Sequence, residues 1–372
     1  MSGFAERSGV SPGDSPVPPA PGDPVPSPSR EDSADPLVTL GEIRAAAARL
    51  DGVIVATPLV PFPGSQPPLL VKPESLQPIG SFKLRGAYAA ISALPASVRQ
   101  RGVVAHSSGN HAQAVAYAAA LLGVAAVVVV PENAPQVKVA AARRLGARIV
   151  PVEPTLTARV AASQELISRY GYTLIPPFDH REVIAGQGTI GLEIAAQCPA
   201  TDLVVVPVGG GGLISGISAA IRGLCPGAKV IGVEPELAAD ARDSFLRGER
   251  VAWPPASTQR TIADSLRVEQ VGALPLAHIL SYVDGIVTVT DDEIREAVRR
   301  IAVEAHLVAE PGGAVAVAAC LLKQQDLPAA RAPVAVLSGG NIDPALLAEV
   351  LGPDGGRGHE EGLPPARTLT TG

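Results

Sequence analysis

Short β-branched runs alternate with longer alanine-rich segments along most of the 372-residue chain. The runs are mostly apolar, which is typical of strands buried on both faces of a parallel sheet. The predicted strands are Val103–Ala105, Ala125–Val130, Arg148–Val152, Leu203–Val208, Val230–Val233, Ile286–Val289 and Val334–Leu337. The segments between and before them predict helices at Arg85–Ile91, His111–Leu122, Gln136–Leu145, Leu156–Tyr170, Thr189–Ala196 and Leu213–Leu224. This alternation predicts an α/β fold with parallel-rich sheets flanked by helices.

The two ends of the chain lack this pattern. Residues 1–36 are rich in Pro, Ser, Gly and Asp and cannot bury enough apolar surface to offset the entropy of ordering, so we expect a disordered tail. Residues 353–372 predict a flexible C-terminal tail. The ordered body opens with Thr39 and Glu42 in the spacing of a capping box, which predicts a first helix.

Composition and charge exclude several classes of protein. The formal net charge is -6, which argues against a nucleic-acid or anionic-membrane surface because both need a basic face. No apolar run is long enough to span a membrane, and the N-terminus lacks the pattern of a secretory signal. The 3 cysteines lie far apart without metal-ligand spacing, so we expect reduced thiols in a cytoplasmic protein.

Lysine is scarce, which narrows the search for covalent amine chemistry. The lysines are Lys72, Lys83, Lys138, Lys229 and Lys323. Lys83 lies between Phe82 and Leu84, after a Gly-Ser turn and at the start of a predicted helix. Apolar neighbours and the positive end of the helix dipole both favour the neutral, nucleophilic amine. An ordinary lysine at a helix start would show the same local sequence.

Four consecutive glycines, Gly209 to Gly212, join a predicted strand to the helix that begins at Leu213. Glycine N–H groups followed by a helix N-terminus form a cradle for a phosphate. A close-packed turn is one alternative. A dinucleotide site is another, with Glu234 after the next strand, but Ser215 stands where its fingerprint needs glycine and Lys83 would have no role.

Three further loops precede predicted helices or follow predicted strands. Residues 106–111 (His-Ser-Ser-Gly-Asn-His) place hydroxyls, an amide and free N–H groups at a helix start, which suits a carboxylate, although plain helix capping would use the same residues. Residues 338–341 (Ser-Gly-Gly-Asn) follow a strand at the edge where open parallel sheets bind ligands. Residues 186–189 (Gly-Gln-Gly-Thr) are expected to form a loop that precedes a helix and closes over the site.

Together these strings resemble fold-type II pyridoxal-phosphate (PLP) enzymes, the tryptophan synthase β-like fold, in the branch of threonine/serine dehydratases and serine racemases. The matching strings cover nearly the whole ordered body. They are TPL (57–59), GSFKLRGA (80–87), SSGNHAQ (107–113), IAGQGTIGLEI (184–194), GGGGL (209–213), VEP (233–235), TIADSLRV (261–268), VTVTDDEI (287–294), EPGGAVAVAA (310–319) and LSGGNID (337–343). Ser265-Leu266 departs from the family, which commonly has glycine after TIAD, and this departure leaves the pocket wall and the choice of substrate open.

The resemblance implies a role for each matched position. Lys83 forms the Schiff base with PLP, and Phe82 lies beside the cofactor. The phosphate is held by Gly209, Gly210, Gly211, Gly212 and Leu213; Asn110 contacts the 3′-oxygen and Ser338 faces the pyridine nitrogen. The substrate carboxylate is held by Ser81, Ser107, Ser108, Gly109, Asn110 and His111.

The implied activity is that of a PLP-dependent ammonia-lyase that converts L-threonine, L-serine or both to a 2-keto acid and ammonia by β-elimination. Ser108 leaves a serine racemase open as the alternative, because the related serine can return a proton to Cα on the face opposite the lysine. A non-catalytic PLP-binding protein is a third possibility, although a full set of substrate-loop residues argues against it.

The resemblance also implies features outside the catalytic residues. Glu234, Asp240 and the Ala238 carbonyl match a site for Mg²⁺ or Ca²⁺, and two solvated acids near Arg242 are the alternative. A large PLP-binding domain is expected over residues 37–98 and 180–352, and a small domain with the substrate loop over 99–179. A homodimer follows from the family, and the only other partner expected is the hydroxy amino acid, with no nucleic acid and no membrane.

Overall fold

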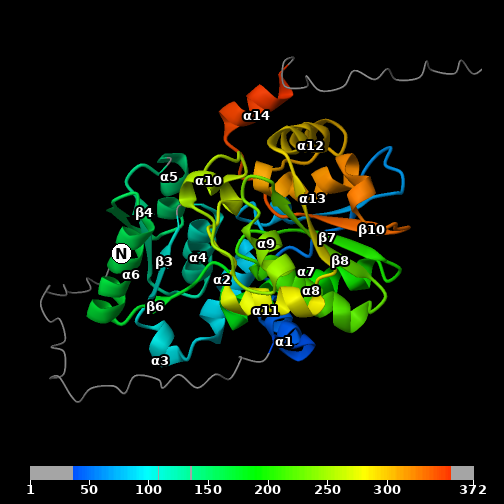
Figure 1. Cartoon of the computed structure of the whole chain (residues 1–372). Coiled ribbons are helices and arrows are strands. Elements are labelled where there is room, and N and C mark those ends of the chain that lie inside the picture. Colours follow the sequence, from blue (N-terminus) through cyan, green and yellow to red (C-terminus); the bar gives the residue numbers. More distant parts are fainter. Residues whose placement is uncertain (1–36, 108, 135, 353–372) are drawn as a thin grey trace, which may run out of the picture. The chain divides into compact units, whose positions relative to one another are not determined.

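Two sheets organise the chain in the computed structural model, which describes residues 37–107, 109–134 and 136–352 (Figure 1). The predicted tails and Ser108 therefore lie outside the described residues. The strands are β1 Val60–Pro61, β2 Leu70–Pro73, β3 Val103–His106, β4 Ala126–Pro131, β5 Arg148–Val152, β6 Thr173–Leu174, β7 Leu203–Pro207, β8 Lys229–Pro235, β9 Gly285–Val289 and β10 Pro333–Leu337. The α/β class is confirmed.

Helices cover both sheets and connect their parallel strands. They are α1 Leu40–Leu50, α2 Lys83–Ala93, α3 Ala96–Arg99, α4 Asn110–Leu121, α5 Gln136–Arg144, α6 Leu156–Tyr170, α7 Arg181–Gln197, α8 Gly212–Leu224, α9 Asp240–Arg247, α10 Pro255–Thr258, α11 Ala273–Tyr282, α12 Asp291–Val303, α13 Pro311–Leu322 and α14 Pro344–Leu351. Short 3-10 turns form at Glu74–Leu76, Asp264–Leu266 and Gln324–Asp326. The predicted capping box at Thr39 and Glu42 is confirmed at the start of α1.

The larger sheet has the strand order β1-β2-β10-β7-β8-β9, and only the β1–β2 pair is antiparallel. The late strand β10 lies between β2 and β7, with Val336 opposite Lys72. The smaller sheet, β5-β4-β3-β6, is wholly parallel. Its strands all fall within residues 99–179, but the described residues belong to one compact unit, so the division into two domains stays a prediction.

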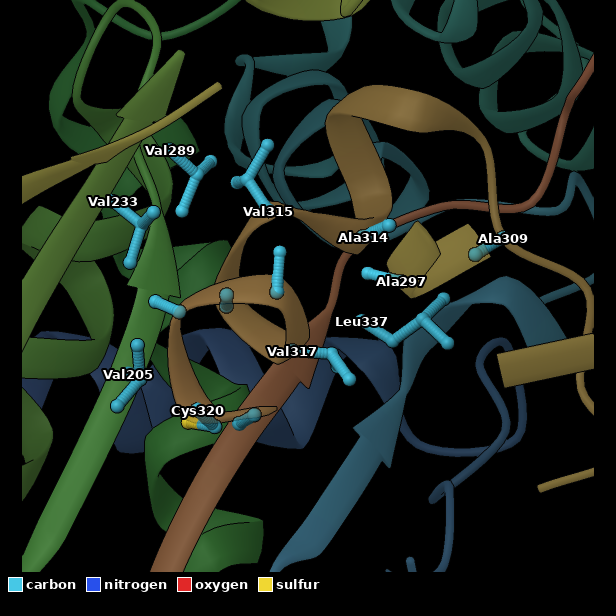
Figure 2. Packing of buried hydrophobic residues seen from close by; sticks show 14 of the residues in the cluster. Val205, Val233, Val289, Ala297, Ala309, Ala314, Val315, Val317, Cys320 and Leu337 are labelled. Carbon is cyan, nitrogen blue, oxygen red and sulfur yellow. The ribbon is translucent and has the colours of Figure 1, made fainter. Parts of the chain in front are cut away.

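Helix α13 forms the centre of the largest apolar cluster. Its residues Pro311 to Cys320 are all buried. Val205 of β7, Val233 of β8 and Val289 of β9 lie around it (Figure 2). Burying a valine side chain contributes about 1.5–3 kcal/mol, so this packing holds the larger sheet and α13 as one body. The N-terminus of α13 is thereby held beside the carboxyl ends of the strands.

The predicted loop over residues 186–189 is wrong, because these residues lie in the middle of α7. Their glycines serve helix packing. A Cβ on Gly186 would lie 2.6 Å from the Arg85 carbonyl oxygen, and a Cβ on Gly188 would lie 2.9 Å from the Gly216 carbonyl oxygen. Helices α2 and α8 therefore approach α7 more closely than any side chain at these positions would allow. This close contact matters because α2 carries Lys83 and α8 follows the glycine loop.

Candidate active site

Lys83 is the first residue of α2, and the preceding residues are tied to the end of β10. Ser81 pairs with Gly339 in an isolated β-bridge, and the Phe82 N–H donates to the Ser338 carbonyl oxygen at 3.0 Å. The resemblance assigned these residues to one site from strings more than two hundred positions apart. The structure brings Ser81, Phe82, Lys83 and Ser338 together. The hydroxyl of Ser81 is buried without a hydrogen-bond partner among the described residues.

The amine of Lys83 is poised to lose its proton. Its Nζ donates to the Pro177 carbonyl oxygen at 2.8 Å and lies 5.0 Å from the centroid of the Phe82 ring. Burial lowers the pKa of Lys83 to about 8, and the charge of Glu310 acts weakly in the opposite sense. The direction is the one that the apolar flanks predict. About a tenth of the amine is therefore in the neutral, nucleophilic form at pH 7, far more than for an ordinary lysine.

A buried ionic network fixes the first turn of α2. Arg85 is wholly buried and donates from Nε and Nη2 to the two carboxylate oxygens of Glu74, each at 2.8 Å. Its Nη1 also donates to Glu193 of α7 at 2.6 Å. Lys72, on β2, donates to the other oxygen of Glu193 at 2.6 Å. Arg85 thus holds the turn that carries Lys83 against β2 and α7. Sequence reasoning did not identify this network.

The glycine loop begins just after β7 and leads into α8. Gly211 has φ +88°, a left-handed conformation that favours glycine. A Cβ on Gly210 would lie 2.2 Å from the Phe178 ring, and a Cβ on Gly212 would lie 2.9 Å from the Phe178 Cα. The first N–H groups of α8 have no acceptor within the helix. The loop therefore presents bare backbone and a helix N-terminus, which fits the phosphate of the expected cofactor.

Three polar side chains from distant loops form a chain beside Lys83. Asn341 Nδ2 donates to the Ile79 carbonyl oxygen and to Asn110 Oδ1, each at 2.8 Å. Asn110 Nδ2 donates to Glu310 Oε1 at 2.6 Å. Glu310 is the N-cap residue of α13 and is 3% exposed, so its charge is held in place within the protein. Neither Glu310 nor Asn341 was among the predicted site residues, although both lie in the matched strings.

The predicted substrate loop surrounds the N-terminus of α4. Gly109 is the N-cap residue, and its N–H donates to Ser107 Oγ at 3.3 Å. His111 Nε2 donates to the Ile175 carbonyl oxygen at 2.8 Å, so its side chain faces β6. Burial, and secondarily the charge of Lys83, lower the pKa of His111 to about 3, and the ring is neutral. A carboxylate at this loop would therefore meet the backbone N–H of His111 and not an imidazolium.

Glu234 and Asp240 form a buried acidic pair, so the alternative of two solvated acids is wrong. Burial first, and the Asp240 carboxylate second, raise the pKa of Glu234 well above its ordinary value; burial raises the pKa of Asp240 to about 7. Glu234 accepts from the N–H groups of Ala241 and Arg242. Neither carboxylate oxygen of Asp240 makes a hydrogen bond of good geometry with the described residues, although the backbone N–H of Val271 lies near enough to oppose the rise in its pKa.

A cation would balance the charge of the buried Asp240 carboxylate, which makes no hydrogen bond of good geometry with the described residues. The described residues contain no cluster of three or more Asp, Glu, His or Cys side chains that could hold a metal. A hard divalent ion here would need backbone oxygens, such as that of the buried Ala238, and water in addition to the two carboxylates. The residues present fit such an ion.

The three cysteines and the apolar helices complete the comparison with what composition predicts. Cys198, Cys225 and Cys320 are free thiols, as expected, and burial raises the pKa of Cys320 to about 12. None of the helices in the described part of the chain combines the length and apolar character that crossing a bilayer requires.

Known proteins resemble this chain in sequence and in structure over most of its length. A family model described as "Pyridoxal-phosphate dependent enzyme" matches residues 50–339. The L-threo-3-hydroxyaspartate ammonia-lyase of Saccharomyces cerevisiae is 39% identical over 84% of this chain and 96% of its own length. The L-threonine ammonia-lyase of Thermotoga maritima is 40% identical over 85% of this chain and 78% of its own length. The serine racemase structure from Dictyostelium discoideum superposes with a TM-score of 0.77 and 39% identity, covering 82% of this chain and 99% of that one.

Proposed function

Because the chain belongs to the pyridoxal-phosphate-dependent enzyme family, we propose that it is an ammonia-lyase of small hydroxy amino acids, converting L-threonine, L-serine or both to a 2-keto acid and ammonia. The observation that carries the proposal is the position of Lys83. Its amine, with a pKa of about 8, lies in one site with Asn110, Glu310 and Ser338. A covalent role needs a lysine of this kind, and the ammonia-lyase relatives cover the whole body.

The residues around Lys83 divide the work of binding and proton transfer. Lys83 would bond to the aldehyde carbon of PLP, and its amine, freed by the substrate, would remove the Cα proton. The glycine loop would hold the phosphate. When bound, the cofactor supplies an electron-withdrawing system that makes loss of the Cα proton possible. The β-hydroxyl would take up a proton and leave as water, and the released enamine would consume one water to give the keto acid and ammonia.

Ser338 favours elimination over longer-lived carbanion chemistry. It is buried and follows directly on β10. The resemblance places its hydroxyl at the pyridine nitrogen, where a hydroxyl cannot balance a full positive charge as a carboxylate would. Negative charge at Cα is then less delocalised into the ring, so prompt expulsion of a β-leaving group is favoured over transamination.

The substrate carboxylate would lie at the N-terminus of α4. The Ser107 hydroxyl and the N–H groups of Asn110 and His111 converge there, and the helix dipole favours an anion. The neutral His111 ring adds no charge. Binding at this end therefore depends on backbone N–H groups and the Ser107 hydroxyl, and we expect the Ser265-Leu266 departure to decide which substrate side chain is accepted.

The test is incubation of the PLP-loaded protein with L-serine, L-threonine and L-threo-3-hydroxyaspartate in turn, with keto acid and D-amino acid separated by chromatography. Keto acid and ammonia in equal amounts are expected. D-serine as the main product would instead establish a racemase, an alternative that the D. discoideum relative and Ser108 keep open. PLP binding without any turnover would support a non-catalytic protein. Lys83→Ala is the control, since it should abolish product formation in either enzyme.

We also propose that Glu234, Asp240 and the Ala238 carbonyl hold Mg²⁺ or Ca²⁺. The support is the burial of both carboxylates and the unsatisfied oxygens of Asp240. Bound at the end of β8 and the start of α9, the ion would stabilise the segment after β8 and take no part in bond breaking. A homodimer and a cytoplasmic location stay predictions.

A further inference from the structure

Hydrogen-bond donors and acceptors determine how the three-residue chain of Asn341, Asn110 and Glu310 is oriented. The Ile79 carbonyl oxygen can only accept, so the side-chain atom of Asn341 that faces it at 2.8 Å must be the NH₂ group. That NH₂ group has two hydrogens. The second is donated to Asn110 at 2.8 Å, and therefore the Asn110 atom facing Asn341 must be its oxygen.

The orientation of Asn110 follows from that of Asn341. With its Oδ1 turned to Asn341, Asn110 presents Nδ2 to Glu310 Oε1 at 2.6 Å. A carboxylate accepts, so the two contacts agree. One hydrogen of Asn110 Nδ2 is used by Glu310, and the other has no acceptor among the described residues and can be donated to a ligand. The amide cannot turn over without placing oxygen against oxygen on one side and NH₂ against NH₂ on the other.

We propose that Asn341 is a positioning residue that, with Glu310, locks Asn110 as a hydrogen-bond donor toward the 3′-oxygen of the cofactor. This inference rests on the proposed function and on the place that the resemblance gives Asn110. A locked donor stabilises the negatively charged form of that oxygen, whereas a rotated amide would oppose it with its own oxygen. Asn341 acts on the cofactor only through its hydrogen bond to Asn110 and contacts no reacting atom itself.

Two glycines leave the space that is needed by the three hydrogen-bonded side chains of Asn341, Asn110 and Glu310, which we call the clamp. A Cβ on Gly80 would lie 2.5 Å from Asn341 Oδ1, and a Cβ on Gly339 would lie 2.5 Å from Glu310 Oε1. Backbone bonds hold the surrounding segments: the Gly340 N–H donates to the Gly80 carbonyl oxygen at 2.9 Å, and the Glu310 N–H donates to the Gly339 carbonyl oxygen at 3.0 Å. The two ends of the clamp are therefore fixed before any ligand arrives.

The test uses the absorbance of bound PLP as well as its affinity. In Asn341→Ala, Asn110 loses the partner that orients it. The proton that lies between the Lys83 nitrogen and the 3′-oxygen of bound PLP should then shift toward the oxygen. We expect the long-wavelength absorbance band of the bound cofactor to weaken relative to the short-wavelength band. We also expect the Kd for PLP to rise about tenfold, which is the effect of losing one charge-assisted hydrogen bond. Asp343→Asn is the matched control: Asp343 caps α14 two residues away, is exposed, and should leave both readouts unchanged.

A second pair of variants covers the case in which Asn341→Ala does not fold. Glu310→Gln keeps an oxygen that accepts from Asn110 and should preserve the ratio of the two bands; Glu310→Ala should lower it. Unchanged ratios in folded Asn341→Ala and Glu310→Ala would overturn the clamp. If wild-type protein itself gives no long-wavelength band with PLP, the proposed function fails and not the clamp alone.

Discussion

Replacing Arg85 with methionine tests whether the buried network holds the lysine-bearing helix in place. The side chain of Arg85 makes bonds with both oxygens of Glu74 and both oxygens of Glu193, and it also donates to Thr189 Oγ1 at 3.0 Å. Methionine fills much of the same volume without a charge. The variant therefore leaves Glu74, which is wholly buried, with one negative charge and no direct ion-pair partner, although Lys72 is near enough to interact with that charge.

The expected loss of unfolding free energy is about 3–5 kcal/mol, because breaking one side of a buried ion pair leaves an uncompensated charge. Glu74 retains weaker donors, since Thr57 Oγ1 and Gln77 Nε2 donate to it at 2.8 and 3.1 Å. Those neutral donors place the expected loss toward the lower end. Glu193 is less affected because it keeps Lys72 and is partly exposed.

The assay is urea unfolding of the cofactor-free protein, since a bound cofactor would add its own stabilisation. Arg295→Met is the matched control: Arg295 pairs with Glu349 on the surface, so its loss should cost less than about 1 kcal/mol. The double variant Arg85→Met/Glu74→Gln should recover part of the loss by removing the stranded charge. A loss below about 1 kcal/mol for Arg85→Met alone would refute the reasoning.

Three further predictions concern the cofactor and metal sites. The rate at which the apoprotein captures PLP should rise with pH, be half-maximal near pH 8 and level off about one unit higher, because the pKa of Lys83 is about 8 and only the neutral amine reacts. A stopped-flow profile still rising steeply at pH 10 would contradict this. In the presence of a chelator, the free energy of unfolding should fall as pH rises toward 7, because the raised pKa of Asp240 means that the native state binds a proton that the unfolded state has lost. Added Mg²⁺ or Ca²⁺ should reverse this trend. A free energy of unfolding that does not change with pH in the chelator would remove the case for a buried acidic pair. Gly210→Ala should weaken PLP binding at least tenfold, as measured by absorbance titration, because its methyl would meet the Phe178 ring; unchanged affinity would show that the loop yields without cost.

Periodicity predicted the fold best where apolar patterns were uninterrupted. All seven predicted strands are present within two residues at either end. The strands β1, β2 and β6 were not predicted. β1 and β6 each have 2 residues, too few to show a pattern. In β2, Lys72 and Pro73 interrupt the apolar run, although both are buried. Lys72 can be buried because it forms an ion pair with Glu193, which lies far along the chain.

Local glycine content misled the prediction at residues 186–189 for a similar reason. Glycine is unfavourable within a helix by about 1 kcal/mol relative to alanine, so two glycines near one another indicate a loop. Here the cost is offset by the approach of α2 and α8, which bury α7 on both sides. Only the partner helices reveal that purpose, and they cannot be identified from the segment itself.

The same limit explains why only one of the three clamp residues was predicted from the sequence. Asn110 was predicted from its own loop, but its partners Glu310 and Asn341 lie 200 and 231 positions away. Whether they meet depends on β10 pairing with β2 in one register, because a shift of one residue would turn Ser338 and its neighbours to the opposite face. A sequence pattern can identify residues with the right chemistry at the ends of strands, whereas their hydrogen-bond partners are decided by the packing of α13 beneath the sheet. For this reason the motif residues indicated the cofactor and the reaction, and the residues that orient them became apparent only in the folded chain.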